Sequence, residues 1–129
     1  MRIDDPKAKA EVEAAFAAYE KALDANDVAA LDGFFFMSDN AIRYGAGENL
    51  YGYAAINAFR AARSPTRLQR KLEKTRIVTY GPDCAVATTL FRRESAPGKI
   101  GRQMQTWIRF PEGWRIVAAH VSVIDDPDA

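Results

Sequence analysis

The stretch WRIVAAHVSVI, residues 114–124, contains the only histidine of the chain, His120, and a serine two positions later, Ser122. Imidazole titrates near neutral pH, so His120 is a candidate for proton transfer or for orienting a substrate. The two side chains point side by side on a strand, a geometry that does not suit a serine–histidine–acid triad. With one histidine and one cysteine, Cys84, we expect no metal site, and no motif calls for a cofactor.

Two side chains in the first half of the chain could recognise or transform a small acid. Arg43 lies between Ile42 and Tyr44, and its guanidinium could grip a carboxylate through two parallel hydrogen bonds. A surface arginine paired with an acid is the alternative. Tyr19 falls on the apolar stripe of a helix, where position alone favours a core tyrosine. Its functional alternative places the hydroxyl in a pocket, where it donates to a carbonyl oxygen or passes a proton.

Other charged residues accompany these two. Glu48, in the glycine-rich loop YGAGENLYG, either pairs with an arginine or acts as a base. The loop lacks the spacing of a phosphate-binding loop, so we expect no nucleotide. Arg60, on the helix expected over residues 53–63, is placed at the mouth of the pocket. The basic residues that follow it are assigned to a solvated surface, namely Arg67, Arg70 and Lys71.

Hydrophobic periodicity predicts helices first and strands afterwards. Asp5-Pro6 supplies a helix cap followed by proline at the first helical position. The expected helices cover residues 6–24, 27–35 and 53–63, with a short strand at 41–44. Four long strands follow, separated by GPD, SAPG and PEG turns, at 68–80, 85–94, 100–110 and 114–124. This order predicts one α+β domain over residues 1–129, with three N-terminal helices on one face of a curled antiparallel sheet.

Alternate residues of the last strand form two faces, and neither has the polar composition of a solvent-exposed face. One face carries Trp114, His120 and Ser122, and the other is dominated by valine, including Val121 and Val123. Polar groups among apolar ones indicate a cavity, so we expect the histidine face to meet the helices. The valine face is expected to be covered by a second copy of the chain, which makes the protein a homodimer.

Composition narrows the class of protein. The 129 residues are 48% hydrophobic, with a net charge of +1, which suits a packed core and gives no reason to expect a nucleic-acid partner. The N-terminal segment is charged throughout, and no segment approaches the roughly 20 apolar residues of a membrane span. We therefore expect a cytoplasmic protein with no membrane partner.

Two segments carry a resemblance to known proteins. The C-terminal GRQMQTWIRFPEGWRIVAAHVS is similar to the last hairpin of the nuclear transport factor 2-like superfamily, which includes SnoaL-like cyclases and ketosteroid isomerase. Together with IRYGAGENLYGYAAINAFRAAR, it resembles the AtzH-like family, whose members include the HpxZ proteins of oxalurate catabolism. The resemblance implies a cone in which a curled sheet wraps around three helices and encloses a pocket.

Two registers of the last two strands are possible, and they predict different residues in the lining of that pocket. With PEG as a three-residue loop, His120 shares its face with Met104 and Thr106. The superfamily pattern instead places a polar residue at Gln105 in the pocket, with Trp107 on the same face. A β-bulge would reconcile the two registers, and we choose Gln105.

The AtzH-like resemblance also implies an activity. It predicts action on a small ureido acid such as 1,3-dicarboxyurea, giving allophanate by amide hydrolysis or decarboxylation, or action on an oxalurate-related acid. Tyr19 and Arg43 correspond to the residues held responsible. The expected substrate contacts are His120, Ser122, Gln105, Trp107, Arg60 and Glu48.

Two rival functions remain open at this point. A non-catalytic subunit that binds a small acid and assists an amidase would need the same pocket. An isomerase acting on a polycyclic substrate would need an acidic base facing an apolar cavity, and the stretches expected at the cavity offer arginine, glutamine and histidine instead.

Overall fold

The computed structural model describes residues 1–63 and 69–128. The first helix, α1 (Pro6–Ala25), begins where expected, because the Asp5 carboxylate accepts a hydrogen bond from the Ala8 backbone N–H at 3.1 Å. It ends at Asn26, which adopts the left-handed conformation with φ 53°.

Two shorter helices complete the helical part. The helix α2 (Val28–Asp32) is shorter than expected, since the prediction extended it to Phe35. After Gly33 the chain leaves the helix, and Phe35 instead forms a parallel bridge with Ile116. The helix α3 (Tyr53–Ala62) ends one residue before its predicted end.

The strands form one sheet of six, in the order β2-β1-β6-β5-β4-β3. The four long strands were predicted, although residue 68, the predicted start of the first of them, lies outside the described residues. The strand β2 was not predicted, because it falls inside the glycine-rich loop. The bounds are β1 (Ile42–Tyr44), β2 (Asn49–Tyr51), β3 (Arg70–Tyr80), β4 (Cys84–Arg93), β5 (Lys99–Phe110) and β6 (Gly113–Asp125).

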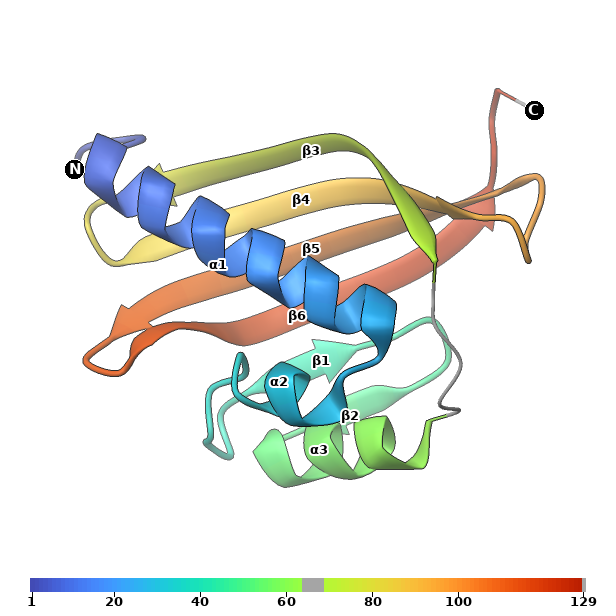
Figure 1. Ribbon diagram of the computed structural model, residues 1–129, viewed down its shortest axis with the longest axis horizontal. Helices are drawn as coiled ribbons and strands as arrows, with labels where there is room; N and C mark the ends of the chain where they lie inside the picture. The colour runs from blue at the N-terminus through green and yellow to red at the C-terminus, as the bar shows by residue number, and fades with distance from the viewer. Residues whose placement is uncertain (64–68, 129) are drawn as a thin grey trace.

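The helices cover one face of the curled sheet, which confirms the α+β cone (Figure 1). Helix α1 crosses the long strands, while α2 and α3 lie beside β1 and β2. Between α1 and the sheet sits a core of fully buried side chains that includes Val12, Leu31, Ile56, Trp107 and Ile116. This core holds α1 on the sheet and leaves the remaining interior space toward one end of the cone.

A β-bulge between β5 and β6 decides which side chains face the helices. Thr106 pairs with Ala118, but the next residue, Trp107, pairs with Ile116, so Val117 is an extra residue on β6. Inward-facing positions therefore change parity at Val117. The predicted continuous face from Trp114 to Ser122 is wrong: Trp114 is buried, whereas Ser122 lies on the outer side.

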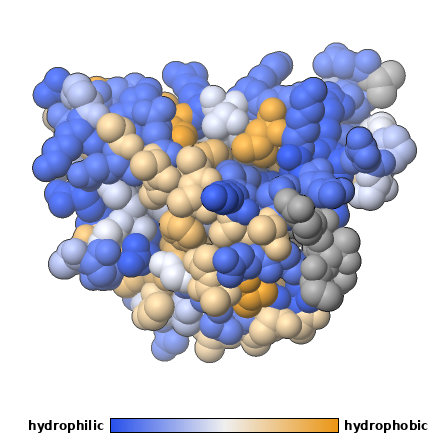
Figure 2. Space-filling view, in the orientation of Figure 1, coloured by the Kyte–Doolittle hydropathy of each residue, from blue (hydrophilic) through white to orange (hydrophobic). Residues whose placement is uncertain are grey.

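The outer surface of the helical side mixes polar and apolar character. Figure 2 shows hydrophilic residues gathered along the side of β3 and β4, and apolar residues in patches over the helices. Among the described residues, no helix combines the length and the apolar character that a membrane crossing requires.

Candidate functional site

A pocket of about 270 Å³ opens between the helices and the curled sheet. Helix α1 contributes Tyr19 to its lining, and apolar contacts come from Phe59, Phe91 and Val121. Its most unusual feature is charge, because six basic side chains line it: Arg43, Arg60, Arg63, Arg70, Arg93 and Lys99. A cavity of this size and charge suits a small anionic molecule.

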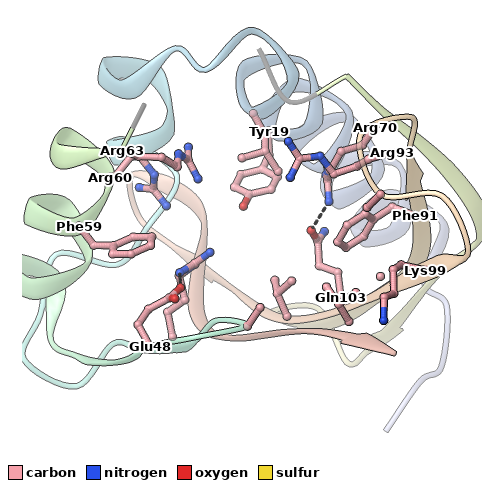
Figure 3. Close-up of a pocket in the computed structure, with 17 residues that line it drawn as sticks. Tyr19, Glu48, Phe59, Arg60, Arg63, Arg70, Phe91, Arg93, Lys99 and Gln103 are labelled. Carbon is pink, nitrogen blue, oxygen red and sulfur yellow. Dashed lines mark hydrogen bonds and ion pairs between the residues drawn. The ribbon is translucent and has the colours of Figure 1, made fainter. Parts of the chain in front are cut away.

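Tyr19 is fixed by aromatic neighbours and keeps its hydroxyl available. The residue is 5% exposed, and its ring meets Phe34 and Trp107 edge-on, with centroids 5.9 and 6.1 Å away. Within the described part of the chain, its hydroxyl makes no hydrogen bond. Figure 3 shows this hydroxyl directed into the open space of the pocket. A rigid ring with an unused hydroxyl is suited to contacting a bound molecule.

Arg43 and Glu48 form an ion pair on the pocket wall. The Arg43 Nη1 donates to Glu48 Oε1 at 2.8 Å, and the guanidinium carbon lies 5.4 Å from the Phe59 ring centroid. The Glu48 carboxylate folds over Gly45, where an added Cβ would lie 1.7 Å from Oε1. A side chain at position 45 would displace the Glu48 carboxylate from this position, and both predicted side chains face the pocket as a pair.

Arg60 and Arg70 are held firmly at opposite sides of the pocket. Arg60 is 3% exposed, with Nη1 3.3 Å from Asp32 Oδ1 and its guanidinium stacked on a phenylalanine ring of the core. Arg70 donates to Gln103 Oε1 at 3.0 Å and to the Glu20 carboxylate. The assignment of Arg70 to a solvated surface is wrong, because its side chain turns inward and is 6% exposed.

The Arg70 site is built as a closed network. Gln103 accepts from Arg70 and donates to Glu20 Oε1 at 2.9 Å, so each of the three side chains contacts the other two. The Arg70 guanidinium also covers the Phe91 ring at 4.6 Å from its centroid. That ring lies against Gly101, where an added Cβ would approach it to 2.1 Å.

Two arginines of the pocket have no carboxylate partner among the described residues, namely Arg63 and Arg93. The Nε atom of each is buried without a hydrogen-bond partner. Among the described residues, the Arg63 guanidinium donates to one side chain, the amide oxygen Oδ1 of Asn26, at 2.9 Å. Burial lowers the pKa of the Arg63 guanidinium, and the charges of Arg60, Arg43 and Arg70 lower this pKa further.

The charge balance of the pocket follows from these pairs. Of the six lining cations, four meet a carboxylate: Arg43 with Glu48, Arg60 with Asp32, Arg70 with Glu20 and Lys99 with Asp125. Arg63 and Arg93 are left unmatched within the described residues, an excess of two positive charges. A bound anion would remove the cost of that excess.

Two predicted contacts lie outside the pocket. His120 is exposed on the outer face of the sheet, with its ring 6.2 Å from that of Tyr44. The Ser122 hydroxyl on the same face accepts a hydrogen bond from Arg102 Nε at 3.1 Å. The predicted placement of both residues in the cavity is therefore wrong, and the bulge described above is the reason.

The same change of parity corrects the assignment of the valine face. Val121 and Val123 line the pocket on the helical side of the sheet, so the outer face of the sheet is not the valine face. The expectation of a homodimer thus loses its stated support. It stays a prediction.

Gln105 and Trp107 face inward as predicted but lie beneath the pocket. The Trp107 indole Nε1 donates to Gln105 Oε1 at 3.0 Å, and the residues are 0% and 2% exposed, respectively. The residue of this strand face that reaches the pocket is Gln103, two positions earlier. Strand alternation from Gln105 would have indicated it.

The described residues bring together no three side chains of histidine, cysteine, aspartate or glutamate that could hold a metal ion. The pocket lining likewise contains no histidine, cysteine, serine or threonine within the described ranges. Its polar chemistry is that of guanidinium, ammonium, carboxylate, amide and phenol groups.

Comparison with known families and structures gives consistent matches. The model of the AtzH-like family matches residues 1–127. A crystal structure from Pectobacterium atrosepticum, described as a DUF3225-family protein with unknown function, is 56% identical, covers 95% of each chain and has a TM-score of 0.92. A cystatin-like fold protein from Burkholderia xenovorans is 43% identical over 98% of this chain and 99% of its own, with a TM-score of 0.94.

More distant structures share the fold. A nuclear transport factor 2-like superfamily protein from Salmonella enterica is 23% identical, covers 94% of each chain and has a TM-score of 0.76. Comparison with curated proteins gives no match.

Proposed function

Since this chain belongs to the AtzH-like family, we propose that its pocket binds a small ureido acid and removes one carboxyl group from it. The proposed substrate is 1,3-dicarboxyurea, or an oxalurate-related acid, and the proposed product of the former is allophanate. The observation that carries the proposal is an unused phenol, Tyr19, facing a pocket with two unmatched guanidinium groups.

Arg43 is the proposed anchor for the carboxylate. Its planar guanidinium can donate to two oxygens at once, and its present partner is one carboxylate oxygen of Glu48. A substrate carboxylate would share or replace that contact. Glu48, only partly buried, could then turn toward solvent, since its side chain is 24% exposed.

Tyr19 is the proposed proton donor. In decarboxylation the bond between nitrogen and the carboxyl carbon breaks, its electron pair stays on nitrogen, and that nitrogen must gain a proton as carbon dioxide leaves. The phenol can supply this proton, and the surrounding guanidinium charges would stabilise the tyrosinate that remains until solvent reprotonates it.

Hydrolysis is the alternative route to the same product. Water would add to the carboxyl carbon, bicarbonate would leave, and the phenol would again protonate the departing nitrogen. Neither route requires a covalent enzyme intermediate, which fits a lining without a serine, threonine or cysteine nucleophile in the described residues. That same lining would also serve a non-catalytic subunit that presents a small acid to an amidase.

The test is the initial rate of allophanate formation from freshly prepared 1,3-dicarboxyurea, with the uncatalysed rate subtracted. Tyr19→Phe should lower the rate by roughly 10²–10⁴-fold, the range of general acid catalysis, with little change in binding. Tyr51→Phe makes the same chemical change on the exposed strand β2 and should keep full rate. Equal rates with and without the protein would reject catalysis and favour the accessory role.

The same reaction separates the two routes. Decarboxylation of the dianion consumes one proton and releases carbon dioxide, so an indicator dye should report an early rise in pH before the gas hydrates. Hydrolysis releases bicarbonate directly and leaves the pH nearly constant.

A further inference from the structure

The basic residues of the pocket fall into two groups with Tyr19 between them. Figure 3 shows Arg60 and Arg63 on one side and Arg70 and Arg93 on the other, with the Tyr19 hydroxyl directed into the space that separates them. All four arginines line the same pocket of about 270 Å³, so one small molecule can reach both sides.

Each side pairs an arginine that meets a carboxylate with one that meets none among the described residues. Arg60 is occupied by Asp32, and Arg70 is occupied by Glu20 and Gln103. Arg63 and Arg93 retain buried Nε donors that the described residues do not use. Arg60 also keeps a buried Nε without a partner, but it is held by Asp32, so the carboxylate-paired arginine of each side builds the wall. The arginine without a carboxylate is left to contact a ligand.

Arg93 is the more informative of these two, because it stands away from the proposed anchor. Arg43 packs against Phe59 of helix α3, and Arg63 caps the end of that helix, so Arg43 and Arg63 belong to one side of the pocket. The Arg93 side chain makes no hydrogen bond or ion pair with any described residue, and its buried Nε donor is costly to leave without a partner. An arginine kept in that state is explained by an anion that pairs with it.

We infer that Arg93 is a specificity-determining residue that binds a second carboxylate of the ligand, opposite the carboxylate held near Arg43. This inference rests on the proposed function and adds to it a reason for selecting dicarboxylic acids over monocarboxylic acids. A dicarboxylic acid would match both unmatched charges of the pocket, whereas a monocarboxylic acid would leave Arg93 unpaired.

The test compares two stable acids by isothermal titration calorimetry. Glutarate carries two carboxylates separated by three carbons, like the three-atom link of dicarboxyurea. Butyrate has the same three-carbon chain with one carboxylate. The native protein should bind glutarate more tightly. Arg93→Gln should weaken glutarate binding roughly tenfold to a hundredfold, the range of a charge-assisted hydrogen bond, and leave butyrate binding nearly unchanged.

Two further variants serve as controls. Arg102→Gln removes the same charge from the exposed outer face of the sheet and should leave both affinities as they are. Arg93→Lys keeps the charge and should retain part of the preference for glutarate. Circular dichroism before titration verifies that each variant is folded.

The outcomes separate this inference from the proposed function. If Arg93→Gln weakens both acids equally, or neither, Arg93 does not bind a second carboxylate. The native protein binding both acids with equal affinity would overturn the inference as well. In either case the loss of rate in Tyr19→Phe would still decide the proposed reaction independently.

Discussion

Two arginines three positions apart should change the stability of the protein in opposite directions when each is replaced by methionine. Methionine keeps the length of the apolar stem and removes the guanidinium. Like Arg63→Met, Arg60→Met removes a buried Nε without a partner, but it also leaves the partly buried Asp32 without its cation and removes the stacking on Phe35. Because the Asp32 side chain keeps 19% exposure and a second donor, Asn57, we expect a loss of about 2–3 kcal/mol in the free energy of unfolding.

Arg63→Met should be stabilising. It removes a buried Nε without a partner, which costs about 1–3 kcal/mol, and it loses one hydrogen bond to Asn26, worth about 1 kcal/mol. The variant also removes the electrostatic repulsion between Arg63 and the other pocket arginines. Since the residue is only half-buried, we expect a net gain near 1 kcal/mol, or a melting temperature about 3–5 °C higher for a chain of this length.

The assay is thermal unfolding followed by circular dichroism, in low salt and without added anions. The gain of Arg63→Met should shrink as salt screens the repulsion between the pocket arginines. Added glutarate should raise the melting temperature of the native protein more than that of Arg63→Met. If Arg63→Met destabilises the protein as much as Arg60→Met does, the pocket holds no uncompensated charge, and the electrostatic reasoning about its ligand fails.

Three other perturbations test separate features. Gly101→Ala places a Cβ 2.1 Å from the Phe91 ring and should cost about 1–3 kcal/mol in urea unfolding, because that ring must move within a packed wall. Asp5→Ala removes the cap of α1 and should cost about 1 kcal/mol, measured in the same way. The Arg92 guanidinium lowers the pKa of Asp126, so this ion pair contributes stability above the unfolded-state pKa of the carboxyl, about 3.9, and loses it as the pH falls through the lower folded-state value. Asp126→Asn should therefore flatten the decrease in melting temperature between about pH 5 and pH 2, whereas an unchanged pH profile would contradict the pairing.

The sequence predicted the architecture because its signals are local. The cap at Asp5, the helical spacing of Tyr19 with its apolar neighbours, and the turns between the long strands each depend on residues close together in the chain. Helix α2 was predicted too long because Phe35 is apolar at a helical position, while its actual pairing with Ile116 is a contact between distant segments.

The pocket was predicted only in part, for a related reason. Tyr19, Arg43, Glu48 and Arg60 line it, as the sequence and the resemblance suggested. His120 and Ser122 were misplaced, because the bulge that turns them outward is a property of two paired strands.

The missed basic residues illustrate a second limit. Arg70 was assigned to a solvated surface and Arg93 was not singled out, since a single strand does not reveal which of its faces the fold encloses. Once β3 and β4 are paired with their neighbours, alternate positions turn these side chains into the pocket, whereas Arg92 points away to Glu73 and Asp126. The net charge of +1 therefore does not reveal the cluster of basic side chains in the pocket.

The extra residue Val117 determines which side chains of the following segment of β6 border the pocket. In the present register, valines border the pocket, and His120 and Ser122 face outward. Removing that one residue would rotate the following segment by half a turn and present an imidazole and a hydroxyl to the bound acid in place of hydrocarbon. A protein of this shape could thus acquire a new set of reactive groups by losing one amino acid, with every other residue of the strand unchanged.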